Sequence, residues 1–192
     1  MKILLPFTLL IAFVAAAPSI ESSAPDVAKI QESLVKVSFL DDAGDTHFCT
    51  GFIIDIAGRV ATAEHCISDH NLQVDGNDSY VIKKDGWIAI VANGPKERRP
   101  LQFAQKMPEP LEKVWSFGNA FDWGFIVLER VVAGYYDTEV GHKDLTVNAP
   151  LGPGMSGGPI VNAKGEVVAI NQMSTNSTGI GCEAKAIKAL LK

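Results

Sequence analysis

A serine embedded in glycines is the segment of this sequence best suited to chemistry. Residues Gly152–Pro159 read Gly-Pro-Gly-Met-Ser-Gly-Gly-Pro and contain Ser156. Because glycine adopts positive φ without strain, this backbone can turn tightly and bring N–H groups close to a ligand. Such a loop suits an acyl-transfer nucleophile, since preorganised N–H groups stabilise the oxyanion of a tetrahedral intermediate. A phosphate-binding loop is the rival interpretation, but no lysine stands at the P-loop position. A structural Gly/Ser turn without chemical function is the third interpretation.

A serine hydroxyl needs a base, and the sequence offers four histidines. His47, His70 and His142 lie in polar, turn-like surroundings that are typical of exposed side chains. His65 differs, because it ends the small-residue run that starts at Val60 and is followed directly by a cysteine. We therefore take His65 as the candidate base.

The three cysteines allow at most one bridge within the chain and one odd thiol. A bridge between Cys49 and Cys66 would close a loop of about 17 residues, contribute about 3 kcal/mol in the loop-entropy model, and hold the backbone beside His65. Histidine and cysteine also bind zinc, but their spacing here lacks the paired pattern of structural zinc sites, so we expect no metal. Cys182 is expected to be a small buried hydrophobic residue, with intermolecular pairing as the alternative.

These motifs resemble those of a known family. Cys49-Thr-Gly-Phe, Ala61–Cys66 and Gly154–Pro159 are similar to the histidine and serine motifs of chymotrypsin-fold, or trypsin-like, serine peptidases, in the same order. The second half resembles the HtrA (Deg) branch, since Phe117–Phe121 is similar to its Gly-x-Pro-Phe turn, with alanine in place of proline. The resemblance covers about residues 30–192. It implies an all-β fold of two six-stranded antiparallel barrels with a cleft between them and a C-terminal helix.

The resemblance also implies an activity, that of a secreted serine endopeptidase with a polypeptide substrate. Ser156 would attack the peptide carbonyl, His65 would take its proton, and the N–H groups of Gly154 and Ser156 would form the oxyanion hole. Pro150, six residues before the serine, would contribute to the base of the primary specificity pocket. Because Pro150 carries no charge, we expect a small or aliphatic substrate side chain there. The mechanism requires no metal or organic cofactor.

The acid of a catalytic triad is the least clear residue in the sequence. The family places an aspartate directly before a short apolar strand, which here resembles Ile88–Val91, and Trp87 occupies the aspartate position. Asp85, two residues earlier, is our first candidate. Asp122 also precedes an apolar run, but it lies too close to Ser156 in the sequence to leave room for the intervening strands. Another acid or a Ser–His dyad is the remaining option, and a non-catalytic peptide-binding module on the same fold is the alternative function.

Short β-type runs separated by Gly, Asp and Asn turn signals must position these residues. The expected strands are 34–40, 49–55, 60–63, 71–74, 80–83 and 87–92, then 114–117, 125–132, 145–148, 159–162 and 166–172. The apolar residues of 183–191 share one face of a helix. We expect a peptidase domain at 30–192, with barrel one at about 30–95, a connector at 96–110 and barrel two at 111–192, after a flexible lead-in at 18–29.

The composition excludes several other classes of protein. The 192-residue chain is 47% hydrophobic, so it can bury a core and is not disordered. Its 22 acidic against 17 basic residues give a net charge of -5, which argues against a nucleic-acid partner.

The first residues are expected to direct export of the chain. Residues 1–17 combine Lys2 with an apolar run that ends in small residues and is shorter than the roughly 20 residues of a membrane span. They therefore indicate a signal peptide and a secreted or periplasmic protein, with no stable membrane association after cleavage. We expect a monomer, and the segment after Ser156 is too short for an appended PDZ-type peptide-binding domain.

Overall fold

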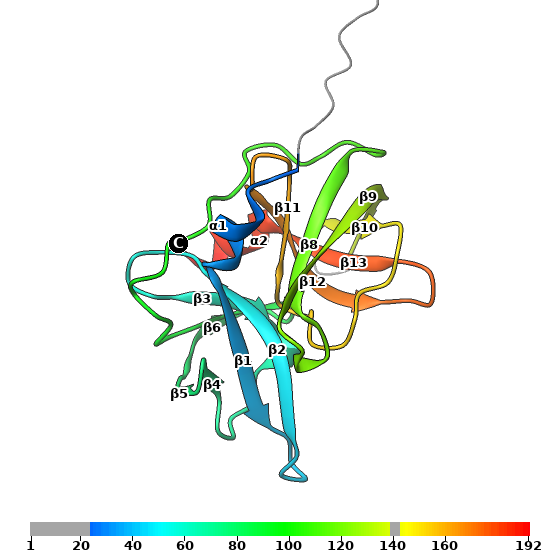
Figure 1. The fold of residues 1–192 in the computed structure, drawn as a ribbon. Coiled ribbons are helices and arrows are strands. Elements are labelled where there is room, and N and C mark those ends of the chain that lie inside the picture. Colours follow the sequence, from blue (N-terminus) through cyan, green and yellow to red (C-terminus); the bar gives the residue numbers. More distant parts are fainter. Residues whose placement is uncertain (1–23, 139–142) are drawn as a thin grey trace, which may run out of the picture.

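The computed structural model describes residues 24–138 and 143–192, and the predicted signal peptide and His142 lie outside these residues. The strands form two groups that meet along one side, with both helices at the junction (Figure 1). The first group comprises β1 (Leu34–Leu40), β2 (Thr46–Ile53), β3 (Val60–Ala63), β4 (Gln73–Val74), β5 (Asn77–Asp78), β6 (Val81–Lys84) and β7 (Ile88–Val91). The second comprises β8 (Lys113–Asn119), β9 (Phe125–Asp137), β10 (Lys143–Val147), β11 (Pro159–Val161), β12 (Val167–Ser174) and β13 (Gly179–Glu183).

Antiparallel pairing in the two groups confirms the all-β, chymotrypsin-like prediction. The second group closes into a six-stranded barrel in the order β10-β13-β12-β11-β8-β9. The first is a seven-stranded sheet in the order β5-β4-β1-β2-β3-β7-β6, which curls into a half-barrel but does not close. Its strands β4 and β5 have two residues each, too few to carry the ladder around to β6.

The main hydrophobic core lies between the two strand groups. Phe52 on β2, Phe117 on β8 and Ile170 on β12 are fully buried in one cluster with residues of α2. Strands β3 and β7 are buried at every position, because one face packs inside the first sheet and the other faces the second barrel. The ends of these buried strands are therefore fixed relative to the second barrel.

Two short helices cover the junction. Helix α1 (Val27–Gln31) begins after Asp26, whose Oδ1 accepts a hydrogen bond from the N–H of Lys29 at 3.2 Å. The end of the segment predicted as a flexible lead-in, residues 27–29, is therefore helical, and Ile30 is buried next to it. Helix α2 (Ala184–Leu190) confirms the predicted C-terminal helix and packs into the same cluster as Ile30, beside α1 (Figure 1). Within 24–138 and 143–192, none of the helices combines the length and apolar character needed to span a membrane.

Candidate active site

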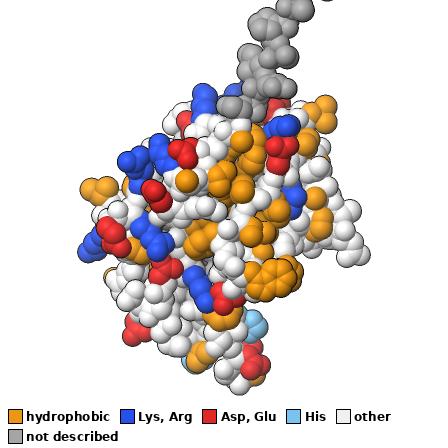
Figure 2. All heavy atoms as spheres, viewed as in Figure 1, with side chains coloured by type: hydrophobic (Ala, Val, Ile, Leu, Met, Phe, Trp, Pro, Cys, Tyr) orange, Lys and Arg blue, Asp and Glu red, His pale blue; other side chains and the backbone are white. Residues whose placement is uncertain are grey.

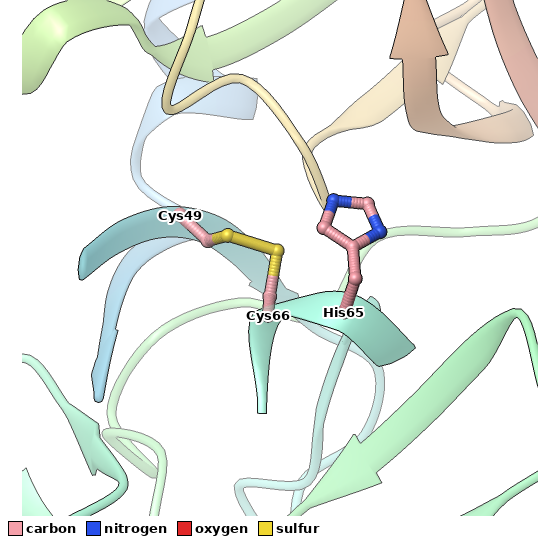
Figure 3. A group of neighbouring side chains, drawn as sticks. All are labelled: Cys49, His65 and Cys66. Carbon is pink, nitrogen blue, oxygen red and sulfur yellow. A yellow bond between two sulfur atoms is a disulfide. The ribbon is translucent and has the colours of Figure 1, made fainter. Parts of the chain in front are cut away.

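His65 lies in η1 (Glu64–Cys66), a single 3-10 turn directly after the buried strand β3. Cys66 forms the predicted disulfide with Cys49 of β2. A ring nitrogen of His65 and the two sulfurs lie within 4.8 Å of one another, and Figure 3 shows the ring beside the bridge. Because the sulfurs are bonded to each other, they are not the thiolates that bind zinc. The bridge instead ties the histidine turn to β2.

The loop between β10 and β11 carries Ser156 and reaches the first strand group through its glycines. Gly154 and Gly157 have φ of 85° and 81°, in the left-handed region that favours glycine. A Cβ at Gly157 would lie 2.1 Å from the carbonyl oxygen of Thr50 and 2.9 Å from the backbone nitrogen of Ala63. The serine loop therefore lies directly against the end of β3, from which η1 and its histidine start.

Thr50, a residue that sequence reasoning missed, fastens the serine loop to β2. Its N–H donates to the carbonyl of Ser156 at 2.9 Å, and its Oγ donates to the carbonyl of Gly154 at 2.8 Å. The same oxygen accepts from the N–H of Asn119 at 2.8 Å. Its sequence signal was a polar residue beside Cys49 in the buried half of the strand, and that position alone did not indicate a loop contact.

Two backbone N–H groups of the serine loop are available as donors. The carbonyl of Pro153 accepts a hydrogen bond from the N–H of Phe121 at 2.8 Å, so the N–H of Gly154, across the same planar trans peptide, points the opposite way. The carbonyl of Met155 likewise accepts a hydrogen bond within the loop at 3.0 Å. Among the described residues, the N–H groups of Gly154 and Ser156 donate to no protein group. This arrangement fits the oxyanion hole that the sequence predicted.

A polar bridge links Ser156 to the histidine turn. The Oγ of Ser156 donates to the carbonyl of Gln172 at 3.3 Å. The side chain of Gln172 donates to the carbonyl of Trp87 at 2.9 Å, and that carbonyl also accepts from the N–H of Glu64 at 2.8 Å. Within the described residues, Ser156 and His65 are not hydrogen-bonded to each other, a contact that often tightens only when substrate binds.

His65 opens onto a shallow cleft of about 500 Å³ at the junction of the two strand groups. Its lining residues are Glu64, His65, Ile67, Lys84, Gly86, Trp87, Gln172 and Met173. Gln172 and Met173 come from the end of β12, so both strand groups contribute to the cleft.

Each of the two acid candidates has partners other than the histidine ring. Asp85 caps the turn between β6 and β7, where its Oδ1 accepts from the N–H groups of Trp87 at 3.1 Å and Ile88 at 3.0 Å. Asp122 forms an ion pair with Lys36 at 2.8 Å, which holds the pKa of its carboxyl below the ordinary range. Both carboxylates thus have structural partners.

Burial sets the direction in which the pKa of His65 is shifted. Desolvation by burial lowers the pKa of His65 from its ordinary 6.5 and is the cause of the shift. A carboxylate at the ring would favour the charged imidazolium and raise the pKa. The lowered pKa favours the neutral imidazole that a general base requires.

The loop before Ser156 carries no charged side chain at Pro150 or Leu151. Pro150 is exposed, and its carbonyl accepts a hydrogen bond from Arg130 at 3.0 Å. The next residue, Leu151, bonds through its N–H to the Oγ of Ser174 on β12 at 2.6 Å. A Cβ at Gly179 of β13 would lie 3.1 Å from the Leu151 side chain, so the loop packs tightly on these two strands.

His47, His70 and the odd cysteine have surroundings separate from the serine loop. His47 and His70 are exposed and face Asp41 at 2.8 Å and Asp42 at 3.9 Å. Cys182 is fully buried in the main core, and burial is the largest influence that raises the pKa of its thiol. The expectation of a small buried residue is confirmed, and intermolecular pairing would require this sulfur to become accessible.

Comparison with known proteins classifies the chain. The family described as "Trypsin-like peptidase domain" matches residues 49–170, a span that contains both His65 and Ser156. The chain belongs to this trypsin-like peptidase family. The match confirms the resemblance stated from the motifs.

Curated relatives of this trypsin-like domain come from the HtrA branch. The human serine protease HTRA3 is 28% identical over 151 residues, which cover 67% of this chain and 33% of that protein. The serine protease Do-like HtrB of Bacillus subtilis (strain 168) is 33% identical over 79 residues, covering 36% of this chain and 17% of that protein. The chain thus spans about a third or less of the curated relatives it matches.

Solved structures share the fold over nearly the whole chain. The active form of the Rv3671c protease from M. tuberculosis superposes with a TM-score of 0.77 at 23% identity, covering 96% of this chain and 93% of that one. The serine endoprotease from Yersinia pestis superposes with a TM-score of 0.74 at 20% identity, covering 86% of this chain and 63% of that one. At these identities the likeness establishes the chymotrypsin-like fold.

Proposed function

We propose that this trypsin-like protein is an exported serine endopeptidase in which Ser156 is the nucleophile and His65 the general base. One observation carries the proposal: the glycine loop presents Ser156 beside the histidine turn while the N–H groups of Gly154 and Ser156 remain without a protein acceptor. A merely structural turn would not need to leave the N–H of the serine and that of the residue two positions earlier without an acceptor.

The chemistry follows from these positions. His65 takes the proton of Ser156 as Oγ attacks the peptide carbonyl, and the oxygen of the tetrahedral intermediate accepts from the N–H groups of Gly154 and Ser156. Each such donor is worth about 3 to 4 kcal/mol of transition-state stabilisation. His65 then protonates the leaving amine, and water hydrolyses the acyl-enzyme by the same steps in reverse.

We assign Asp85 a positioning role in this mechanism rather than contact with the reacting atoms. Its carboxylate caps the turn that places the carbonyl of Trp87, and that carbonyl holds both the N–H of Glu64 and the side chain of Gln172. Asp85 thus acts on His65 and Ser156 through the backbone. Ser156 and His65 form a catalytic dyad.

The substrate is proposed to be a polypeptide with a small or aliphatic residue before the cleaved bond. Pro150 and Leu151 present no charge on the loop preceding Ser156, and Gly179 adds none from β13. A lysine or arginine side chain loses hydration free energy when it is buried, and a site without an acid provides no ion pair to offset that cost. We propose that the protein acts as a monomer outside the cytoplasm, where the Cys49–Cys66 disulfide persists.

A peptide-binding module without catalysis is the second candidate. Trp87 at the position where the family has its aspartate favours it, because a binder needs no acid to orient the histidine. Such a module would retain the cleft at His65 but would have no use for a reactive Ser156.

Covalent labelling separates the two candidates. We expect a fluorophosphonate probe to label the purified protein on Ser156, because the probe needs only an activated serine and an oxyanion hole. Mass mapping of the modified peptide identifies the site, and boiled protein is the control. A folded protein that stays unlabelled would leave the binding module as the better assignment.

The pH profile should report the low pKa of His65. Neutral imidazole is the active form, so kcat/KM is expected to fall as pH drops through the pKa of His65 in the free protein. Because desolvation lowers this pKa, half-maximal activity should lie below pH 6.5. Rates on one peptide from pH 4 to 8, corrected for stability at each pH, measure it. A midpoint above 6.5 would instead indicate a carboxylate at the ring.

A further inference from the structure

An exposed pair of aromatic side chains lies at η2 (Ala120–Asp122), the turn between β8 and β9; Phe121 is in η2, and Trp123 directly follows it. Phe121 is 51% and Trp123 84% exposed, and their ring centroids lie 4.9 Å apart. Apolar side chains are visible on the face of the molecule that carries β8 and β9 (Figure 2). Two large rings held together in water expose apolar area that burial under a ligand would remove.

The backbone of this turn is strained and held by specific bonds. Phe121 and Asp122 both have positive φ, at 54° and 57°, a conformation that costs non-glycine residues energy. The side chain of Asn119 donates to the carboxylate of Asp122 at 3.0 Å and accepts from the N–H of Gly124 at 2.9 Å. Lys36 adds the ion pair with Asp122 at 2.8 Å. These contacts fix the turn that carries the two rings.

The aromatic pair is built onto the loop that carries the nucleophile. The N–H of Phe121 donates to the carbonyl of Pro153, three residues before Ser156. A Cβ at Gly152 would lie 3.5 Å from the Phe121 ring, so the ring borders the start of the serine loop. A peptide bound at Ser156 therefore passes near the pair.

Side-chain contacts connect the turn of the aromatic pair to the strand that carries the disulfide. Because His65 protonates the leaving amine, the chain beyond the cleaved bond leaves past the histidine and the neighbouring disulfide. Phe48 directly precedes Cys49 of that disulfide, and its ring lies 3.8 Å below the Nζ of Lys36. Lys36 joins this surface to Asp122 on η2. Phe48, Lys36 and Asp122 thus link β2, the strand that carries Cys49, to the turn of the aromatic pair.

We propose that Phe121 and Trp123 bind a large apolar side chain of the substrate segment that follows the cleaved bond. The proposal rests on the endopeptidase function and adds a second determinant of specificity. Covering the rings with a leucine or phenylalanine side chain removes apolar surface of both partners from water. A charged side chain at that position gains nothing from the two rings.

Quenched peptides that differ only beyond the cleaved bond test this inference. They share one acyl side and carry either leucine or aspartate at the first, second or third following position. At one of these positions we expect kcat/KM to favour leucine by about tenfold in the wild type. Trp123→Ala should reduce that preference to near unity, and Trp123→Phe should keep most of it. Ile56→Ala, which removes an equally exposed side chain (85%) elsewhere, should leave the preference unchanged.

Two reagents distinguish a failure of this proposal from a failure of the endopeptidase function. A peptide anilide and the fluorophosphonate probe lack residues beyond the reacting centre, so Trp123→Ala should react with both at the wild-type rate. If the wild type is labelled and Trp123→Ala keeps the leucine preference, the aromatic site is overturned while the endopeptidase function stands. The same holds if the wild type is a dimer and Trp123→Ala is a monomer, because the two rings then bind a second copy of the chain. No labelling of the wild type would overturn the endopeptidase function and this inference together.

Discussion

Ser156→Ala is expected to lower kcat/KM for peptide hydrolysis by at least about 10⁴-fold. The substitution removes the nucleophile while the backbone N–H groups of Gly154 and residue 156 stay in place, so only the rate supplied by the oxyanion hole and by binding remains. The fold should be unaffected, because the Oγ of Ser156 makes one long hydrogen bond, to the carbonyl of Gln172 at 3.3 Å. Casein turnover and a defined peptide both measure the effect.

Ser177→Ala is the matched control for this substitution. Ser177 is exposed in the turn between β12 and β13 and loses the same hydroxyl without touching the serine loop. Its activity should equal that of the wild type, and both variants should show the same melting temperature. If Ser156→Ala retained more than a few per cent of the activity, another residue would have to be the nucleophile.

The fold and the two principal site residues were predictable because their signals are local. Glycines around Ser156 and small residues before His65 are required by backbone contacts, such as the 2.1 Å that would separate a Cβ at Gly157 from Thr50. Apolar alternation marked most of the strands in the right place. Strand β13 escaped the propensity argument, because its sequence Gly-Ile-Gly-Cys-Glu places two glycines in a strand that only tertiary packing supports.

The residues that join the two strand groups could not be predicted in this way. Thr50, Asn119 and Gln172 act through partners far away in sequence, and a polar residue in a strand does not by itself reveal its partner. The incomplete closure of the first sheet could not be predicted either, because it depends on how far two-residue strands can extend the hydrogen-bond ladder. Long-range pairing, rather than local preference, decides both features.

The sequence left open whether an acid contributes to catalysis. The contacts of Asp85 now allow a triad aspartate to be distinguished from a capping residue. In a Ser–His–Asp triad the carboxylate holds the far ring nitrogen, and its replacement by asparagine costs about 10⁴-fold by fixing the wrong tautomer. Here the Oδ1 of Asp85 accepts from the N–H groups of Trp87 and Ile88, and an asparagine oxygen can accept the same two bonds.

We therefore expect His65 and Asp85 to respond very differently to substitution. His65→Ala should lower kcat by at least about 10⁴-fold, because no other described histidine lies at Ser156 to replace the base. Asp85→Asn should change kcat less than tenfold and leave the pH midpoint in place, since both capping bonds survive. Asp85→Ala should lose more, because the turn that places the Trp87 carbonyl loses its cap.

Single-turnover acylation rates and pH profiles of the three variants measure this difference directly. A loss near 10⁴-fold in Asp85→Asn, with the His65 pKa falling further once the negative charge is gone, would make Asp85 a triad acid. Activity that survives Asp85→Asn but not His65→Ala would leave a dyad. Its imidazole is kept neutral by desolvation and oriented by the backbone of η1, by the disulfide beside it and by the capped turn at Trp87.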